Sequence, residues 1–406
     1  MKNIYYIFTL CLAINSFSYA QTQSVILNGG YTNQSFYNFS NGEVLNTSNT
    51  NWDIAFSTDA FSTTIRINDG KGVELYNYTL GDTSDWNLIN NSTTNIISNS
   101  LNNSDTSWEI GAFNLHNGGG FDYSWGVYNL VTHHINGDSL YIIKTINGNW
   151  KKLWIKSKIS GDYLIQYSNL DGSNLVSSFI DASNYDTKRF IYFSMDQNLI
   201  LDREPTLDSW DITFTKYITD LGIPYSVTGV LGNVGIKVAK VTNLVEPYNF
   251  TDYNNQQYNT EINSIGYDWK TFSGGGYTID NNRCYFVKDY QQNVWRLIFS
   301  NFNMSNGKID FNTQLMTNVS INENHRDIFE IYPNPANDIL TVIYELKNNS
   351  SIIIHDMYGR VVYEGLIESG DFYQKEISVT HFKSGVYFLK IVDSNNEYVT
   401  KKLIIE

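Results

Sequence analysis

The sequence is poor in cysteine, the residue that braces many exported proteins and binds structural metals. Only Cys11 and Cys284 occur in 406 residues, and Cys11 lies in an N-terminal segment that we expect to be removed. The mature chain can then form neither an internal disulfide nor a paired-cysteine zinc site, so its stability must come from core burial. Hydrophobic residues make up 42% and aromatic residues 15% of the chain, which is ample for such a core and argues against disorder.

Positive charge and long apolar runs are also scarce. The chain has 27 lysines and arginines against 41 aspartates and glutamates, which gives a formal net charge of −14. Nucleic acids and anionic membranes are bound through basic patches, so this balance argues against both as partners. Beyond the N-terminal segment no stretch approaches the ~20 apolar residues of a membrane span, and we predict no transmembrane segment.

Known catalytic signatures are missing as well. The sequence has no Gly-x-Ser-x-Gly elbow, no His-Glu-x-x-His zinc helix and no phosphate-binding glycine loop with lysine. The glycines at 118–120 and 274–276 are not followed by the helix that phosphate binding needs. We therefore expect a binding protein and not an enzyme. Paired carboxylates for glycoside cleavage leave no local spacing, so a secreted hydrolase stays open as an alternative.

The N-terminus has the order of a secretory signal. Lys2 precedes an apolar run over residues 4–14, and the small residues Ser18 and Ala20 follow. This order predicts a signal peptide over residues 1–20 that is cleaved after Ala20.

Turn signals are frequent in the rest of the chain and helical periodicity is nearly absent, which predicts an all-β protein. In the clearest segment, residues 125–170, Asn136-Gly137, Asn147-Gly148 and Gly161-Asp162 separate apolar or β-branched runs. Because Asn-Gly between such runs is the strongest short hairpin signal, we predict a four-stranded antiparallel meander whose first strand covers residues 125–134.

Apolar side chains alternate with lysines in the third strand of this meander. The alternating residues are Lys152, Leu153, Ile155, Lys156, Lys158 and Ile159. This period of two predicts a sheet with one face against a core and the lysine face in water.

A five-residue pattern occurs twice. Trp-Asp-Ile-Ala-Phe at 52–56 recurs as Trp-Asp-Ile-Thr-Phe at 210–214, with a weaker echo at 267–269. The spacing of 158 residues is too long for a solenoid repeat. We interpret the pair as two strands that bury a Trp and a Phe around a shared core, while Asp53 and Asp211 bond a nearby turn. A catalytic role for the two aspartates is the alternative.

Strand patterning lapses near residues 316–326, where Asn, Ser, Thr and Glu dominate. We place a linker over 315–328, between a large domain over 21–314 and a small domain over 329–406. Short strand runs with regular turns predict an Ig-like β-sandwich for the small domain. These runs are 339–345, 351–356, 361–364, 376–379, 385–392 and 398–405.

The small domain over 329–406 resembles the type A sorting domain of the type IX secretion system of Bacteroidota. The matching motifs are Tyr332-Pro333-Asn334-Pro335-Ala336, Asp356-Met357-Tyr358-Gly359-Arg360, Gly385-Val386-Tyr387-Phe388 and Lys401-Lys402-Leu403-Ile404-Ile405. The resemblance implies that the type IX machinery is a partner and that the protein is secreted or held on the cell surface. An ordinary Ig-like module is the alternative.

The large domain over 21–314 resembles in part the HmuY family of haem-binding proteins. The matching motifs are Ser35-Phe36-Tyr37, Asn41-Gly42-Glu43-Val44, residues 52–56, Arg66-Ile67-Asn68-Asp69-Gly70 and Trp125-Gly126-Val127-Tyr128-Asn129. The resemblance implies an all-β protein that captures haem as its cofactor without turnover. HmuY proteins are typically lipid-anchored, whereas this chain carries a sorting domain instead.

Haem iron takes imidazole or thioether axial ligands, and the large domain offers His116, His133, His134 and Met195. Neighbouring strand residues point to opposite faces, so we expect only one of His133 and His134 to line a pocket. His134 and His116 are our candidate iron ligands, because the glycines after His116 can bend toward the sheet, and Met195 is the alternative partner. Three surface histidines in loops are the simpler interpretation. A carbohydrate-binding or adhesive surface module without haem is the alternative function.

Overall fold

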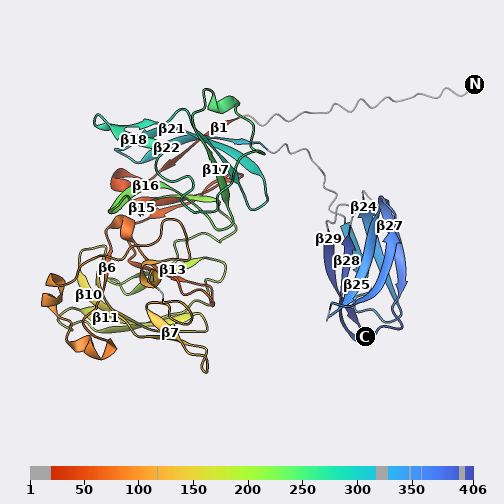
Figure 1. The fold of residues 1–406 in the computed structure, drawn as a ribbon, viewed down its shortest axis with the longest axis horizontal. Coiled ribbons are helices and arrows are strands. Elements are labelled where there is room, and N and C mark those ends of the chain that lie inside the picture. The colour runs from red at the N-terminus through yellow and green to blue at the C-terminus, as the bar shows by residue number, and fades with distance from the viewer. Residues whose placement is uncertain (1–19, 117, 317–327, 347–348, 358, 393–397) are drawn as a thin grey trace, which may run out of the picture. The chain divides into compact units, whose positions relative to one another are not determined.

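The computed structural model describes residues 20–116, 118–316, 328–346, 349–357, 359–392 and 398–406. The regular secondary structure of these residues is almost entirely antiparallel β-strand, which confirms the all-β prediction. The chain forms two compact units, residues 1–317 and 318–406 (Figure 1). The predicted signal peptide up to residue 19 and the linker residues 317–327 lie outside the described residues.

The helical segments in the described part are single short 3-10 turns. They are η1 (Gly29–Tyr31), η2 (Asp69–Lys71), η3 (Thr83–Asn87), η4 (Asn91–Asn95), η5 (Ala112–Asn114) and η6 (Pro247–Asn249).

The first half of the large unit consists of two sheets packed on one core. One sheet has the order β14-β13-β4-β5, with bounds Leu199–Leu201, Phe190–Ser194, Ile54–Ser57 and Ile65–Ile67. The other has the order β12-β11-β10-β9-β6, with bounds Val176–Ile180, Asp162–Asn169, Trp150–Ile159, Leu140–Lys144 and Glu74–Asn77. The short strands β8 (Ile135–Gly137) and β7 (Gly126–Tyr128) extend this sheet beside β10.

The second half has the same two-sheet arrangement. Its four-stranded sheet has the order β16-β15-β2-β3, with bounds Pro224–Gly232, Ile212–Asp220, Asn33–Asn38 and Gly42–Ser48. Its five-stranded sheet has the order β1-β22-β21-β20-β17, with bounds Gln21–Ile26, Lys308–Leu315, Val294–Asn303, Cys284–Lys288 and Lys237–Val241. A separate hairpin pairs β18 (Lys270–Ser273) with β19 (Gly276–Ile279).

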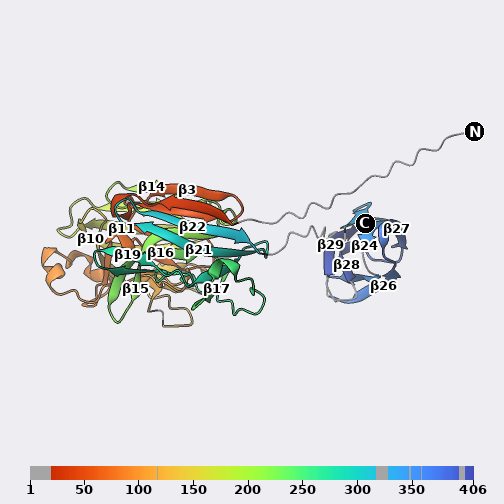
Figure 2. The same cartoon turned by 90° about the horizontal axis from the view of Figure 1, so that it is seen from above.

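The two halves repeat one arrangement of a four-stranded and a five-stranded sheet, which we call the frame. In the second half the N-terminal strands complete this frame. Reading from β4 to β14 gives the first copy, whereas the second runs from β15 to β22 and is completed by β1, β2 and β3. Strand β1 pairs with β22 along its whole length, and β2 pairs with β15. In both views the N-terminal strands, in red, lie beside the last strands of the large unit, in cyan (Figures 1 and 2).

The Trp-Asp repeat marks equivalent strands of the two copies. Asp53 and Asp211 are fully buried. The carboxylate of Asp53 accepts from the backbone N–H groups of Ile146 and Met195, both at 2.7 Å, and that of Asp211 accepts from Phe39 at 2.7 Å. The interpretation of these aspartates as turn-bonding residues is therefore confirmed.

The two phenylalanines of the repeat lie in separate cores, so the predicted shared core is wrong for them. The two tryptophans are linked instead, because Trp108 packs against the cluster of Trp52 and against Trp210. Phe56 packs with the first half's sheets, together with Trp125 and Tyr163, and Phe214 packs with Tyr37 in the second half. The echo at 267–269 is not a third copy, because it lies in a connecting segment outside both frames.

The predicted meander holds for β9, β10 and β11 but fails at its first turn. Asn136-Gly137 lies inside β8, and the predicted strand over 125–134 is the short β7 followed by a loop. A Cβ on Gly137 would lie 1.6 Å from the carbonyl oxygen of Ile155. This glycine therefore permits close approach of two strands instead of making a turn.

The lysine side chains of β10 do not form a water-exposed face, contrary to the prediction. A register shift between Ile155 and Ser157 inverts the alternation, so Lys158 is buried while Ile159 is exposed. Before the shift Lys152 is buried too, and its ammonium donates to the carbonyl oxygens of Trp86 and Ile89 at 2.9 and 3.1 Å. An inserted segment covers this face, which the sequence pattern did not reveal.

A layer of buried polar groups joins the four-stranded sheets of the two halves. The guanidinium of Arg203, from the first half, donates to the side chain of Gln34 at 3.0 Å and to the carbonyl oxygen of Ser48, in β3, at 2.8 Å. Glu204 accepts from the hydroxyl of Tyr192 at 3.0 Å, and burial raises the pKa of Glu204 to about 7. A small cavity of about 60 Å³ lies in this seam.

The small unit is a sandwich of two antiparallel sheets with its own core. One has the order β23-β24-β27, with bounds Ile328–Tyr332, Ile339–Leu346 and Gly370–Ser378. The other has the order β26-β25-β28-β29, with bounds Val361–Ile367, Ser350–Asp356, Gly385–Val392 and Tyr398–Ile405. The six predicted strands are all present.

The proline motif of the small unit is attached to its last strand. Asn334 donates to the carbonyl oxygen of Lys402 at 2.8 Å and accepts from the N–H of Ile404 at 2.8 Å. Ala336 is fully buried and forms a bridge with Ile405. Two motifs about 70 residues apart thus form one structural element, on the edge strand β29.

Candidate functional site

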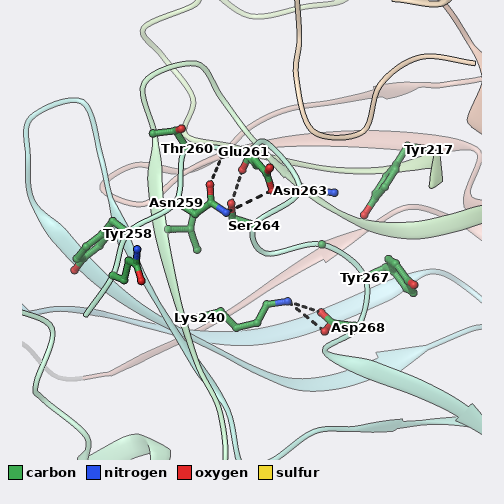
Figure 3. A pocket seen from close by; sticks show the side chains of 13 residues that line it. Tyr217, Lys240, Tyr258, Asn259, Thr260, Glu261, Asn263, Ser264, Tyr267 and Asp268 are labelled. Atoms are coloured by element: carbon green, nitrogen blue, oxygen red, sulfur yellow. Dashed lines mark hydrogen bonds and ion pairs between the residues drawn. The ribbon is translucent and has the colours of Figure 1, made fainter. Parts of the chain in front are cut away.

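A large groove lies in the second half, at the segment that connects β17 to β18. Its volume is about 950 Å³, within the range of roughly 300–1,000 Å³ usual for ligand pockets. We call it the insert groove. It is lined by Tyr217, Val238, Lys240, Gln257, Tyr258, Asn259, Thr260, Glu261, Asn263, Ser264, Gly266, Tyr267 and Asp268 (Figure 3).

Backbone hydrogen bonds hold this irregular segment against the frame. Asn259 exchanges two bonds with Val238, at 2.8 and 2.9 Å, and Gly266 exchanges two with Val230, at 2.9 and 3.1 Å. A Cβ on Gly229 would lie 2.6 Å from the carbonyl oxygen of Gly266, so only glycine allows this approach. The groove therefore has a fixed floor although its wall is a loop.

The wall presents polar side chains that are arranged by one another. The amide of Asn259 accepts from the N–H of Glu261 at 3.0 Å, and the hydroxyl of Ser264 donates to the carbonyl oxygen of Glu261. Asn263 donates to the carboxylate of Asp105 at 3.0 Å, which ties the wall to the first half. Amides, hydroxyls and a carboxylate thus face the groove in fixed positions (Figure 3).

Tyr217 supplies an unsatisfied hydroxyl at the groove. Its side chain is 6% exposed, and its hydroxyl has no hydrogen-bond partner among the described residues. Burial raises the pKa of this phenol well above its usual range, so it stays protonated. The close view shows the hydroxyl directed toward the groove between Asn263 and Tyr267 (Figure 3). A buried hydroxyl without a partner calls for an explanation, and a ligand oxygen would supply the missing bond.

Asp268 forms one end of the groove and is already paired. Lys240 donates to its two oxygens at 3.0 and 3.2 Å, and Arg283 lies 3.0 Å away. Burial alone would raise the pKa of Asp268, but the bonds from Lys240 and the charge of Arg283 outweigh it and lower that pKa. The carboxylate therefore stays ionised with its charge balanced by two cations.

The three predicted histidines all lie in the segment between β6 and β9 of the first half. His116 precedes the segment in which Asp122 bridges Val127 of β7, while His133 and His134 lie in the loop between β7 and β8. The prediction that His133 and His134 are consecutive strand residues is thus wrong, because the loop gives His133 a φ of 58°. Its ring nitrogen lies 2.8 Å from the hydroxyl of Tyr128.

Met195 is separated from these histidines. It is 2% exposed in the first half's core, and its backbone N–H is the donor to Asp53. His116 and His133 are exposed and His134 is half-buried. Neither the insert groove nor the seam cavity is lined by any of the four candidate ligands. Within the described residues, no group of three or more His, Cys, Asp or Glu side chains is placed to hold a metal ion.

The insert groove itself was missed by reasoning from the sequence. Within residues 242–269, only the Tyr-Asp-Trp echo at 267–269 is singled out from the sequence. The available signal was the dense alternation of Asn, Gln and Tyr over residues 253–263 in a long segment without strand patterning. Segments of that kind are uncommon inside compact domains unless they have a function.

Two known proteins show similarity to parts of this chain. A protein named endo-acting ulvan lyase from Formosa agariphila is 33% identical over 76 residues, which cover 19% of this chain and 14% of that protein. The crystal structure of dimeric latent PorU from Porphyromonas gingivalis aligns with a TM-score of 0.19 and 11% identity, over 68% of this chain and 32% of the other. The chain thus spans a small part of both proteins.

Within the described residues, no helix is both long and apolar enough to cross a membrane. Residues 330–406 match the family described as the secretion system C-terminal sorting domain. The predicted sorting function of this unit is thereby confirmed, and the protein is one that is secreted or displayed on the cell surface through its C-terminal sorting domain.

Proposed function

We propose that the large unit binds a polysaccharide outside the cell and that the insert groove is its binding site. The observation that carries this proposal is the buried, unpartnered hydroxyl of Tyr217 at a large groove lined with amides and hydroxyls. Sugar hydroxyls both donate and accept hydrogen bonds, so they match a lining that offers Asn, Gln, Ser, Thr and Tyr groups together.

Aromatic side chains in the lining support the same function. Tyr258 and Tyr267 are half-buried and lie on different sides of the groove (Figure 3). Tyrosine combines an apolar ring face with a polar end, so a ring of this kind can cover the apolar face of a sugar while its hydroxyl stays in water. Export to the exterior places such a site where polysaccharides occur.

Binding is tested with the full mature chain by retention in gels and by titration calorimetry. The polysaccharides are ulvan, chosen from the relative's name, together with pectin and laminarin. Tyr217→Phe removes only the unpartnered hydroxyl, so we expect a three- to tenfold loss of affinity without loss of stability. Tyr290→Phe is the matched control, because the Tyr290 hydroxyl is also buried without a partner among the described residues but does not line the groove. Equal affinity in both variants, or no retention by any polysaccharide, would contradict the proposal.

Haem capture is the second candidate, and one observation favours it. The three histidines of the large unit lie in the segment between β6 and β9, which also exposes Phe121, Leu130 and Val131. Apolar side chains beside imidazoles suit a porphyrin, for which His116 and His134 would be the iron ligands. Titration with haem should give a Soret band that is lost in His134→Ala and retained in Thr132→Ala, at an exposed position of the same loop. Absence of saturable binding would eliminate this candidate.

A further inference from the structure

A second cavity continues the insert groove beyond Tyr267 and Asp268. Its volume is about 380 Å³, and Tyr267 and Asp268 line both spaces. We call it the tyrosine-lysine cavity. It is lined by Tyr31, Lys216, Tyr225, Ser226, Val227, Thr228, Tyr267, Asp268, Lys270, Thr271, Phe272 and Tyr277. The two spaces therefore lie next to each other, on either side of Tyr267 and Asp268.

Aromatic rings make up much of this cavity and are unusually exposed. Tyr225 is 54% exposed and Phe272 is 57% exposed. The ring of Tyr277 lies edge-on to that of Phe272, at 5.2 Å between centroids, and Tyr31 stacks with Phe302 at 5.9 Å. Exposed rings held in place by their neighbours are suited to cover a flat ligand surface.

Lysines provide the charge in this cavity. The ammonium of Lys216 lies 5.9 Å from the ring of Tyr31, and that of Lys270 lies 4.2 Å from the ring of Trp269. Lys71 donates to the carbonyl oxygen of Tyr31 at 3.1 Å. In the part of the chain that the structure describes, none of these lysines forms an ion pair with a carboxylate. The nearest acid, Asp268, is engaged by Lys240 and Arg283.

This local excess of cations contrasts with the rest of the molecule. The chain carries a formal net charge of −14, so carboxylates to pair with lysines are abundant elsewhere. Lys216 is half-buried and Lys270 is buried. Burial of an ammonium without a counter-ion is costly, and a bound anion offsets that cost. Burial lowers the pKa of Lys270 to about 7, although the charge of Asp268 opposes this shift.

We infer that the tyrosine-lysine cavity binds an acidic sugar unit, one that carries a carboxylate or a sulfate ester, of the polysaccharide held in the insert groove. This inference rests on the proposed polysaccharide function and narrows it to anionic polysaccharides. Lys216 is the residue that contacts the anion, because Lys270 already donates to the backbone carbonyl oxygens of Thr228 and Tyr267. The rings cover the sugar face, and Lys71 adds positive potential.

The test compares three polysaccharides on the full mature chain by calorimetry. Polygalacturonate supplies carboxylates, carrageenan supplies sulfate esters and dextran is neutral. Lys216→Met should weaken binding of the acidic polymers about tenfold, the loss expected for one charge-assisted contact, and leave dextran unchanged. Lys216→Arg keeps the charge and should lose less than threefold. Lys237→Met is the control, since Lys237 is exposed on β17 and lines neither space.

The outcomes separate this inference from the proposal on which it rests. If dextran and the acidic polymers bind equally and Lys216→Met changes nothing, the inference fails while the polysaccharide function stands. If no polymer binds, the polysaccharide function fails. Titration with free glucuronate and glucose 6-sulfate then tests separately whether the cavity binds an acidic sugar. Saturable, Lys216-dependent binding of either monosaccharide supports the cavity as an acidic-sugar site, and its absence overturns it. Preference for one of the two identifies carboxylate or sulfate as the ligand.

Discussion

The two halves of the large unit share one frame but differ in the segment inserted at the same place in it. In the first half, the segment over residues 78–139 between β6 and β9 contains the three histidines. In the second half, residues 242–283 between β17 and β20 form the insert groove and the β18–β19 hairpin. The sheets around both insertions have the same strand order. Function is therefore to be sought in the inserts, while the frame supplies stability.

Residues at equivalent positions of the frame show what that stability depends on. Asn68 donates to the carbonyl oxygens of Asn49 and Trp52, at 3.0 and 3.2 Å. Asn233 donates in the same way to Leu207 and Trp210, at 2.7 and 2.8 Å. Each copy thus uses a buried amide to close the chain before its Trp-Asp strand. The frame repeats its buried polar contacts, which explains why the Trp-Asp pattern is visible in the sequence.

The largest effect is expected from removal of β1, β2 and β3, the N-terminal strands that complete the second half. Over the described residues, the first half has no such strands from the N-terminus. Deleting residues 21–48 removes Val25, Phe36 and Tyr37, which are at most 2% exposed. Burial of each such side chain contributes ~1.5–3 kcal/mol, and a typical domain is stable by only about 5–15 kcal/mol. We expect the second half to unfold, as measured by near-ultraviolet circular dichroism.

The first half should survive this deletion as a protease-resistant fragment that begins near Trp52. Deletion of residues 328–406 is the control, because they belong to the separate small unit and their loss should leave the large unit's urea midpoint unchanged. If the 21–48 deletion unfolds at the midpoint of the intact chain, the closure by β1 to β3 is not required for stability.

A smaller effect is expected from the two equivalent aspartates. Asp53→Ala removes an acceptor of two backbone N–H groups, whereas Asp211→Ala removes the acceptor of the Phe39 N–H. A hydrogen bond to a charged group contributes ~1.5–3 kcal/mol. Urea unfolding should therefore show a loss of about 3 kcal/mol for Asp53→Ala and about 2 kcal/mol for Asp211→Ala. A larger loss for Asp211→Ala would show that the two copies are not stabilised in the same way.

The smallest effect concerns the pH dependence of the free energy of unfolding. It depends on Glu204, a buried carboxylate of the first half in the polar layer between the two halves. Burial raises the pKa of Glu204 from 4.5 to about 7. The folded state thus holds this proton more tightly than the unfolded state. The resulting stabilisation is complete below about pH 4.5 and is lost as pH rises through about 7.

Glu204→Gln should remove that dependence, so that the free energy of unfolding of the variant exceeds that of the intact chain by ~2 kcal/mol at pH 8 relative to pH 5. Stability curves in urea at the two pH values measure this difference. Asp186→Asn, at an exposed position, is the control and should follow the unsubstituted chain. An unchanged slope in Glu204→Gln would mean that other buried carboxylates, such as Asp211, dominate the pH dependence.

Strand positions in the small unit were predictable because each depends on a local pattern. The predicted runs at 385–392 and 398–405 coincide with β28 and β29. In the large unit the same reasoning failed at Asn136-Gly137, because a glycine that permits close strand packing cannot be told from a turn glycine by its neighbours in sequence. It also failed at Lys152, whose burial depends on a segment more than 60 residues away.

The sequence by itself determined the all-β class, the sorting domain and the existence of two related Trp-Asp strands, since each is written in short patterns of residue type. Only the tertiary structure decided that β1 to β3 complete the second copy and that the segment before β18 encloses a groove. It also decided that Lys216 lies without an ion-pair partner among the described residues beside Tyr31. These features depend on pairings between residues that are distant in sequence, and such pairings leave no local spacing from which they can be predicted.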